Sequence, residues 1–145
     1  MKTLGSCFCG TVEFSISGEI PEPLDCYCTN CSKLHGAAFA THTVVRTENF
    51  EWLKGFESVK SFESSKDNFR HFCGKCGSQL IVFNHNYPGI TVVVYAALDS
   101  KNVPSVTAKL FTSRKPSWLN DKAVQYDESV TEEEWDRYVE KWHLS

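Results

Sequence analysis

Seven cysteines fall into three closely spaced groups, and thiolates at such spacings are typical zinc ligands. The groups are Cys7-x-Cys9, Cys26-x-Cys28-x-x-Cys31 and Cys73-x-x-Cys76. The first and last groups lie in turns flanked by glycine, and each can supply two ligands to a shared tetrahedral site. The simplest partition therefore places one closed zinc site at Cys7, Cys9, Cys73 and Cys76, and leaves the middle group to hold a second ion.

The middle group lies in the segment DCYCTNCSKLHG (residues 25–36) and supplies only three ligands. Catalytic zinc sites usually have three protein ligands and leave the fourth position to water or substrate, whereas structural sites have four. A histidine could close the site instead, and the candidates are His35, His42 and His71. The spacing thus predicts one closed site and a second site whose role depends on its fourth ligand.

Other uses of the cysteines fit the pattern less well. Disulfides require an even count, and cysteines one residue apart bridge only with strain. A redox-active Cys-x-x-Cys pair usually precedes a helix, whereas a strand is predicted soon after Cys76. Cysteines that served only as small buried residues would rarely be spaced so closely. An iron–sulfur cluster needs a similar number of thiolates, so the spacing alone leaves that alternative open.

The composition indicates a globular protein. The 145 residues are 41% hydrophobic, which is enough for one domain with its own core. No stretch resembles a secretion signal or a membrane span, so we expect a cytoplasmic protein whose cysteines stay reduced. The formal net charge of −3, with no cluster of lysines and arginines, argues against nucleic-acid and membrane partners.

Short strands dominate the predicted secondary structure. In TVEFSIS (11–17), apolar residues alternate on one face, as in a half-buried strand. The segments 79–84 and 90–98 are the strongest predictions, and we expect them to pair as antiparallel strands joined across residues 85–89. Further strands are predicted at 38–45, 50–53, 58–63, 68–72 and 108–112, and a loop at 19–25. The sequence predicts a mainly β fold, mostly antiparallel, with the cysteines in its loops.

One helix is predicted near the C-terminus. Thr131 and Glu134 have the spacing of a capping box, in which each side chain accepts a hydrogen bond from the other's backbone. An apolar stripe with helical spacing follows, made of Trp135, Tyr138, Val139 and Trp142. We expect this stripe to pack against the sheet.

Taken together, the cysteine motifs resemble the glutathione-dependent formaldehyde-activating enzyme family, which includes the domain of centromere protein V. They are G-S-C-x-C-G-x-V, then C-x-C-x-x-C followed by H-G-A-A-F, then F-C-x-x-C-G-S-x-L, between about Gly5 and Lys115. The resemblance implies a β-tent fold of small coiled antiparallel sheets around zinc, with one C-terminal α-helix, as a single domain over residues 1–145. It also implies two zinc ions per chain. One is structural and held by Cys7, Cys9, Cys73 and Cys76, and the other is catalytic and held by Cys26, Cys28 and Cys31.

The resemblance further implies a carbon–sulfur lyase that acts on S-hydroxymethylglutathione, the adduct of glutathione and formaldehyde. The catalytic residues would be the three cysteines of the middle group, with the fourth position left to water or to the thiol. A thiolate-rich open site is a weak Lewis acid, which suits thiol chemistry better than hydroxide generation. Glutathione carries two carboxylates, so a basic residue is expected nearby. The candidates are Lys33, Arg46, Arg70 and Lys75.

Two residues depart from the family pattern. Tyr27 stands where relatives usually have histidine, and Ser32 stands where a basic residue is common. Both lie in the predicted active loop, so they bear on the substrate rather than on metal binding. The alternative interpretation is a non-catalytic zinc-binding scaffold for protein interactions, in which the middle group is a second structural clip.

Overall fold

A three-stranded antiparallel sheet carries much of the hydrophobic core. In this computed structural model, which describes residues 1–143 and the side chains of residues 1–141, the strand order is β1 (Lys2–Ser6), β2 (Glu13–Ser17) and β5 (Phe50–Lys54). Phe14 and Ile16 of β2 lie on the same face because side chains alternate along a strand, and both are fully buried. Phe14 stacks on Phe50 with ring centroids 5.2 Å apart.

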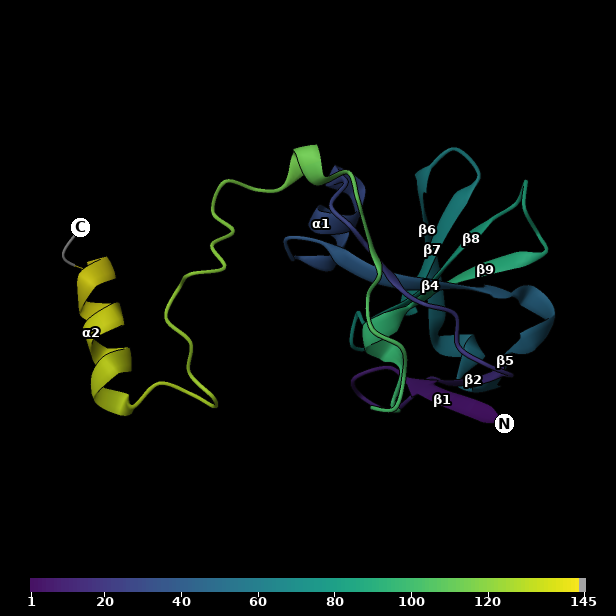
Figure 1. Cartoon of the computed structure of the whole chain (residues 1–145). Coiled ribbons are helices and arrows are strands. Elements are labelled where there is room, and N and C mark those ends of the chain that lie inside the picture. Colours follow the sequence, from purple (N-terminus) through teal and green to yellow (C-terminus); the bar gives the residue numbers. More distant parts are fainter. Residues whose placement is uncertain (144–145) are drawn as a thin grey trace.

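A seven-stranded sheet forms the larger part of the fold (Figure 1). Its strands, in spatial order, are β10 (Ala108–Leu110), β3 (Leu24–Cys26), β4 (Ala40–Arg46), β9 (Ile90–Val94), β8 (Gln79–Asn84), β7 (Asn68–Cys73) and β6 (Val59–Ser65). Neighbouring strands run antiparallel except β10 and β3, which are parallel. The predicted mainly β, mostly antiparallel fold is confirmed.

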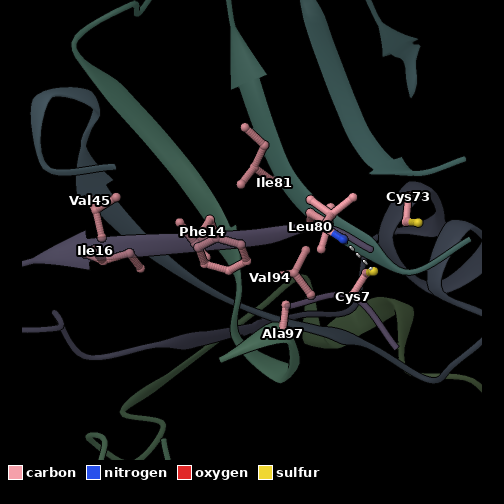
Figure 2. Close-up of a cluster of buried hydrophobic side chains, with 11 residues drawn as sticks. Cys7, Phe14, Ile16, Val45, Cys73, Leu80, Ile81, Val94 and Ala97 are labelled. Carbon is pink, nitrogen blue, oxygen red and sulfur yellow. Dashed lines mark hydrogen bonds between the residues drawn. The ribbon is translucent and has the colours of Figure 1, made fainter. Parts of the chain in front are cut away.

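The hydrophobic core contains residues from both sheets and includes two cysteines. Figure 2 shows Phe14 and Ile16 of β2 in one cluster with Leu80 of β8. Cys7 and Cys73 belong to the same buried cluster and lie at one end of it in this view. Two of the predicted metal ligands, from distant segments of the chain, therefore lie in a packed apolar cluster.

The strands differ from the prediction mainly at β9 and β3, and the sequence pattern does not indicate β1. The apolar run 90–98 continues past the end of β9, but a 3₁₀ turn over Tyr95–Ala97 follows Val94. Ala97 is buried there, so the run reflects burial rather than extended structure. The predicted loop 19–25 already contains the start of β3, where Leu24 pairs with His42. The remaining 3₁₀ turns are Thr47–Asn49, Phe56–Ser58 and Thr112–Arg114.

A short helix, α1 (Thr29–His35), is not indicated by the sequence pattern. It spans only seven residues, and Cys31 is the one buried side chain among them, so no apolar periodicity marks it. The sulfur of Cys28 caps the helix by accepting the N–H of Cys31 at 3.4 Å. Gly36 ends it in the left-handed conformation with φ 60°. The middle cysteine group therefore lies at a strand–helix junction and not in the predicted loop.

The C-terminal helix, α2 (Glu132–His143), begins with the predicted capping box. The N–H of Glu134 donates to Thr131 Oγ1 at 3.3 Å, and the N–H of Thr131 donates to the Glu134 carboxylate at 2.9 Å. The expected packing of its apolar stripe on the sheet is wrong. Trp135 and Tyr138 are 55% and 46% exposed, and Figure 1 shows α2 apart from both sheets after a long irregular segment. The side chain of Trp142 lies outside the described part.

Helical spacing shows that α2 has an apolar face, but it does not say which surface covers that face. Here the segment between β10 and α2 carries the helix away from the sheets, so Trp135 and Tyr138 remain exposed. Neither α-helix within residues 1–143 combines the length and apolar character needed to span a membrane.

Candidate metal centres

Four cysteines from two turns place their sulfur atoms within 4.8 Å of one another, and they are Cys7, Cys9, Cys73 and Cys76. The first two follow β1, Cys73 is the last residue of β7, and Cys76 lies in the turn between β7 and β8. The sulfur of Cys9 lies 3.6 Å from that of Cys7 and 3.9 Å from that of Cys73. Sulfurs bound to one tetrahedral zinc lie roughly 3.8 Å apart. The structure thus brings together the four predicted ligands in a geometry that fits zinc, and all seven cysteines are free of disulfides.

Glycines shape both cysteine turns. Gly10 and Gly77 have φ values of 74° and 80°, which other residues adopt only with strain. The N–H of Gly10 donates to the carbonyl of Cys7 at 3.0 Å, and the N–H of Gly77 donates to that of Cys73 at 2.8 Å. In the first turn the N–H of Val12 also donates to the Cys7 sulfur at 3.2 Å. These bonds fix the direction of the sulfurs without regular secondary structure.

Three of the four thiols, Cys7, Cys9 and Cys76, differ in how readily they lose a proton. The hydroxyl and the N–H of Ser78 lower the pKa of Cys76 to about 5, and those of Thr11 lower the pKa of Cys9. Burial raises the pKa of Cys7. Zinc binds the thiolate form, so zinc binding at this cluster releases a proton from Cys7 to a greater extent than from Cys9 or Cys76.

The second cluster consists of Cys26, Cys28 and Cys31, whose sulfurs lie within 4.8 Å of one another. Cys26 is the last residue of β3, Cys28 caps α1, and Cys31 lies in the first turn of that helix. Among the side chains of residues 1–141, no histidine, cysteine or carboxylate adds a fourth ligand atom at this distance. The donor set fits a zinc ion with three protein ligands.

The histidines considered as a fourth ligand do not join this cluster. His35 of α1 and His42 of β4 pack edge to face, with ring centroids 5.5 Å apart. The Nε2 atom of each ring is buried and has no hydrogen-bond partner among the described residues. His71 has its Nδ1 atom 3.3 Å from the carbonyl oxygen of Phe69. A site closed by one of these histidines is therefore not what the structure contains.

The protonation of the three thiols also varies. Burial raises the pKa of Cys26, and it raises the pKa of Cys31 to about 12. Burial acts on Cys28 in the same direction, but hydrogen bonds from the N–H groups of Cys31 and Asn30 outweigh it and lower its pKa. Metal must displace protons from two buried thiols, so the metal affinity of this cluster rises with pH.

One arginine contacts the three-cysteine cluster. Arg70 of β7 is only 7% exposed, and its Nη2 atom donates to the Cys31 sulfur at 3.6 Å. Its hydrogen bond and charge oppose the rise in the pKa of Cys31. An N–H donor on a ligating sulfur also withdraws charge from it, which makes a bound metal more electrophilic. The other candidate basic residues are exposed, and they are Lys33, Arg46 and Lys75.

The two residues that depart from the family pattern make contacts with neighbouring protein groups. Tyr27 is 3% exposed and packs against Phe39, with ring centroids 5.0 Å apart. The hydroxyl of Ser32 donates to the carbonyl of Thr29 at 3.3 Å. Both side chains are accommodated without disturbing the arrangement of the three sulfurs.

Two cavities adjoin α1. The larger, of about 610 Å³, lies between α1 and the four-cysteine turns and is lined by Phe8, Leu34, His35, Ser78, Gln79 and Asp99 among others. The smaller, of about 320 Å³, is lined by Leu34, Phe62, Arg70, Phe72 and Gln79. Leu34 and Gln79 line both, so the two cavities are neighbours on either side of these residues.

Over most of its length the chain is similar to known proteins. A family model described as glutathione-dependent formaldehyde-activating enzyme matches residues 2–114. A Halomonas elongata protein, provisionally named as a glutathione-dependent formaldehyde-activating enzyme, is 27% identical over 146 residues, covering 96% of this chain and 92% of that protein. The crystal structure of a Rhodobacter sphaeroides protein is similar in fold, with a TM-score of 0.56 and 22% identity, covering 73% of this chain and 100% of that chain.

Proposed function

Because the chain belongs to the glutathione-dependent formaldehyde-activating enzyme family, we propose that it is a zinc-dependent carbon–sulfur lyase. It interconverts S-hydroxymethylglutathione with glutathione and formaldehyde, and it works in a reducing compartment, the cytoplasm. The observation that carries the proposal is the three-cysteine cluster, to which no described residue adds a fourth ligand. An open position of this kind separates catalytic zinc sites from structural ones.

Two zinc ions per chain follow from the two clusters. The four-cysteine cluster holds the structural ion, and Cys26, Cys28 and Cys31 hold the catalytic one. A zinc ion in the open site supplies a position for a thiol sulfur and favours the loss of its proton. The guanidinium of Arg70, 3.6 Å from the Cys31 sulfur, offsets part of the negative charge of the three thiolates.

The reaction adds a thiol across a carbonyl group. An electron pair of the glutathione sulfur forms the C–S bond to the formaldehyde carbon, while the π pair of the C=O bond moves to oxygen. The proton that the thiol has lost ends on this oxygen and completes the hydroxymethyl group. Reversal of these steps releases formaldehyde, and neither direction needs an oxidant or a reductant. The protein has to hold the sulfur, orient the carbonyl and stabilise charge on its oxygen.

The larger cavity supports a tripeptide thiol as the substrate. Its volume of about 610 Å³ is typical of small-molecule sites. The hydroxyls of Ser6 and Ser78 can bond to peptide groups, and the Asp99 carboxylate can pair with the amino group of glutathione. His35 lines this cavity and belongs to α1, the helix that carries Cys31, so the cavity reaches the neighbourhood of the open cluster.

The proposed activity can be measured at equilibrium by carbon-13 exchange NMR. We expect the zinc-loaded protein to accelerate exchange of labelled carbon between hydrated formaldehyde and S-hydroxymethylglutathione, in proportion to protein concentration. Removal of zinc by a chelator should abolish the acceleration, because the thiol then has no metal position to occupy. An exchange rate equal to that of the protein-free mixture would contradict the proposal.

A non-catalytic zinc-binding scaffold is the second candidate function. The apolar residues of α2 favour it, since Trp135 and Tyr138 are 55% and 46% exposed and suit contact with another protein. In that case the three-cysteine cluster is a structural clip. The same exchange measurement separates the two functions, because a scaffold gives no acceleration with or without zinc.

A further inference from the structure

We propose that Arg70, His42 and His35 form a binding site for the oxygen atom of the carbonyl substrate, beside the three-cysteine cluster. This inference rests on the proposed function, because it assigns the residues that receive the oxygen while the sulfur is held at the metal position. The three residues come from β7, β4 and α1, so the fold and not a local motif brings them together.

Arg70 has one nitrogen available for such a ligand. Its Nε atom donates to Ser64 Oγ at 3.0 Å and its Nη2 atom to the Cys31 sulfur at 3.6 Å. Its Nη1 atom is buried, and no hydrogen-bond partner for it is found in the described part of the chain. A buried donor without a partner is costly, and more so when it is charged. Nε and Nη2 of the guanidinium are thus held by hydrogen bonds, and Nη1 is left unsatisfied.

Among the described side chains, no carboxylate pairs with Arg70. The ion pairs between side chains of residues 1–141 involve four other basic residues, and none includes Arg70. The Arg70 residue is nevertheless only 7% exposed. A buried cation is normally paired or bound to a ligand, which makes an oxygen that carries negative charge a fitting partner.

The two histidines add further unsatisfied nitrogens near this guanidinium. His42 is 4% exposed, its ring meets that of His35 at 5.5 Å, and the Nε2 atoms of both are buried without partners among the described residues. Burial lowers the pKa of His42 to about 4, so its ring is neutral near pH 7. Arg70 contacts Cys31, and His35 lies four residues after Cys31 on the same face of α1, so the arginine and the histidine pair adjoin the same cysteine. Neutral imidazoles can donate one hydrogen bond each to an oxygen.

A purely structural role explains only part of this arrangement. Neutralising the Cys31 thiolate needs the contact from Nη2, and anchoring the arginine needs the contact from Nε. Neither use employs Nη1 or the two imidazole nitrogens. Arg70 lines the smaller cavity and His35 lines the larger one, and Leu34 and Gln79 line both, so a small oxygen ligand would approach these buried nitrogens where the two cavities adjoin.

The site would act on the step in which the C–S bond forms. As the π pair of the carbonyl moves to oxygen, the Arg70 N–H group and an imidazole N–H group stabilise the growing negative charge. The proton released by the thiol then moves to this oxygen, so charge and atoms balance. Donors fixed in place beforehand and shielded from water stabilise such charge more strongly than water does.

Formate is a suitable probe, because it has a single carbon and carries its negative charge on two carboxylate oxygens. The full-length, zinc-loaded protein with nitrogen-15 in its five histidines is titrated with sodium formate in the absence of any thiol. We expect saturable shifts of the His35 and His42 ring signals, assigned with single variants. Arg70→Gln should weaken formate binding roughly ten-fold or more, because a charge-assisted hydrogen bond is lost.

Arg46→Gln is the matched control, since Arg46 is an exposed arginine on β4, the strand that also carries His42. Its formate affinity should equal that of the wild type. The absence of shifts at both histidines, or an unchanged affinity in Arg70→Gln, would overturn the proposal. So would loss of zinc from Arg70→Gln with normal formate binding, which would make Arg70 a structural partner of Cys31 only.

If Arg70→Gln does not fold, His35→Gln carries the test, because His35 is partly exposed at the end of α1. A weaker formate affinity is expected and an equal one contradicts the site. Formate binding requires neither glutathione nor turnover. An inactive protein that binds formate through Arg70 would therefore disprove the proposed lyase and not the oxygen site. An active protein that does not bind formate would disprove the oxygen site and not the lyase.

Discussion

Cys76→Ala is expected to leave a largely unfolded or aggregating protein. The four-cysteine cluster joins the turn after β1, in the three-stranded sheet, to the turn between β7 and β8, in the seven-stranded sheet. Cys9 and Cys73 are 64 residues apart in sequence, so a metal shared by these turns closes a long loop. Structural zinc contributes on the order of 10 kcal/mol to folding, which is comparable to the whole stability of a typical domain.

The choice of Cys76 keeps this test free of a packing effect. Cys73 is fully buried in the core cluster, so its truncation would also leave a cavity. Cys76 is partly exposed, and its loss removes mainly a ligand. Circular dichroism, thermal unfolding and zinc content should be measured together. A Cys76→Ala protein that retains two zinc ions and the wild-type unfolding midpoint would show that this cluster does not stabilise the fold.

Cys28→Ala is expected to keep the fold and lose the activity. Its cluster spans only residues 26–31 at the junction of β3 and α1, so the metal there adds little long-range constraint. Loss of the catalytic zinc should reduce the rate of adduct exchange by at least on the order of a hundred-fold, because the Lewis acid supplies several kcal/mol. Zinc content should fall by one ion per chain while the β signature in circular dichroism remains.

A small loss of stability is expected in this variant for a separate reason. The Cys28 sulfur caps α1 by accepting the N–H of Cys31 at 3.4 Å, and loss of a cap costs about 1 kcal/mol. Cys28→Ser retains an oxygen that can cap the helix, so it should recover this stability without recovering activity. If Cys28→Ala unfolds as badly as Cys76→Ala, the three-cysteine cluster is a structural clip and its catalytic assignment is wrong.

Most of the strands and the two cysteine clusters could be predicted from sequence because their signals are local, whereas β1 and β3 could not. Alternation in TVEFSIS marks β2, and the two-residue spacing in Cys73-x-x-Cys76 marks a ligand turn. Joining that turn to Cys7 and Cys9 required only a count of ligands. The capping box of α2 was equally visible, since it depends on two residues three positions apart.

The surroundings of the open cluster could not be predicted in the same way. Arg70 is 39 residues from Cys31 and reaches it through the pairing of strands, so it appeared only as one of several basic candidates. His35 and His42 were candidates for the fourth zinc ligand, but in the structure their rings pack edge to face against each other. Helix α1 escaped prediction because it is short, and the position of α2 did so because amphipathic spacing does not identify a partner surface.

In the proposed function, the fourth position of the three-cysteine site accepts a substrate thiol. The most direct test replaces zinc with cobalt in the full-length protein and follows the visible absorption of the bound cobalt during titration with glutathione. We predict a saturable change in the ligand-field bands, no change with S-methylglutathione, which lacks a free thiol, and no change in Cys28→Ala. A spectrum that stays constant up to millimolar glutathione, with both cobalt ions bound, would contradict the claim.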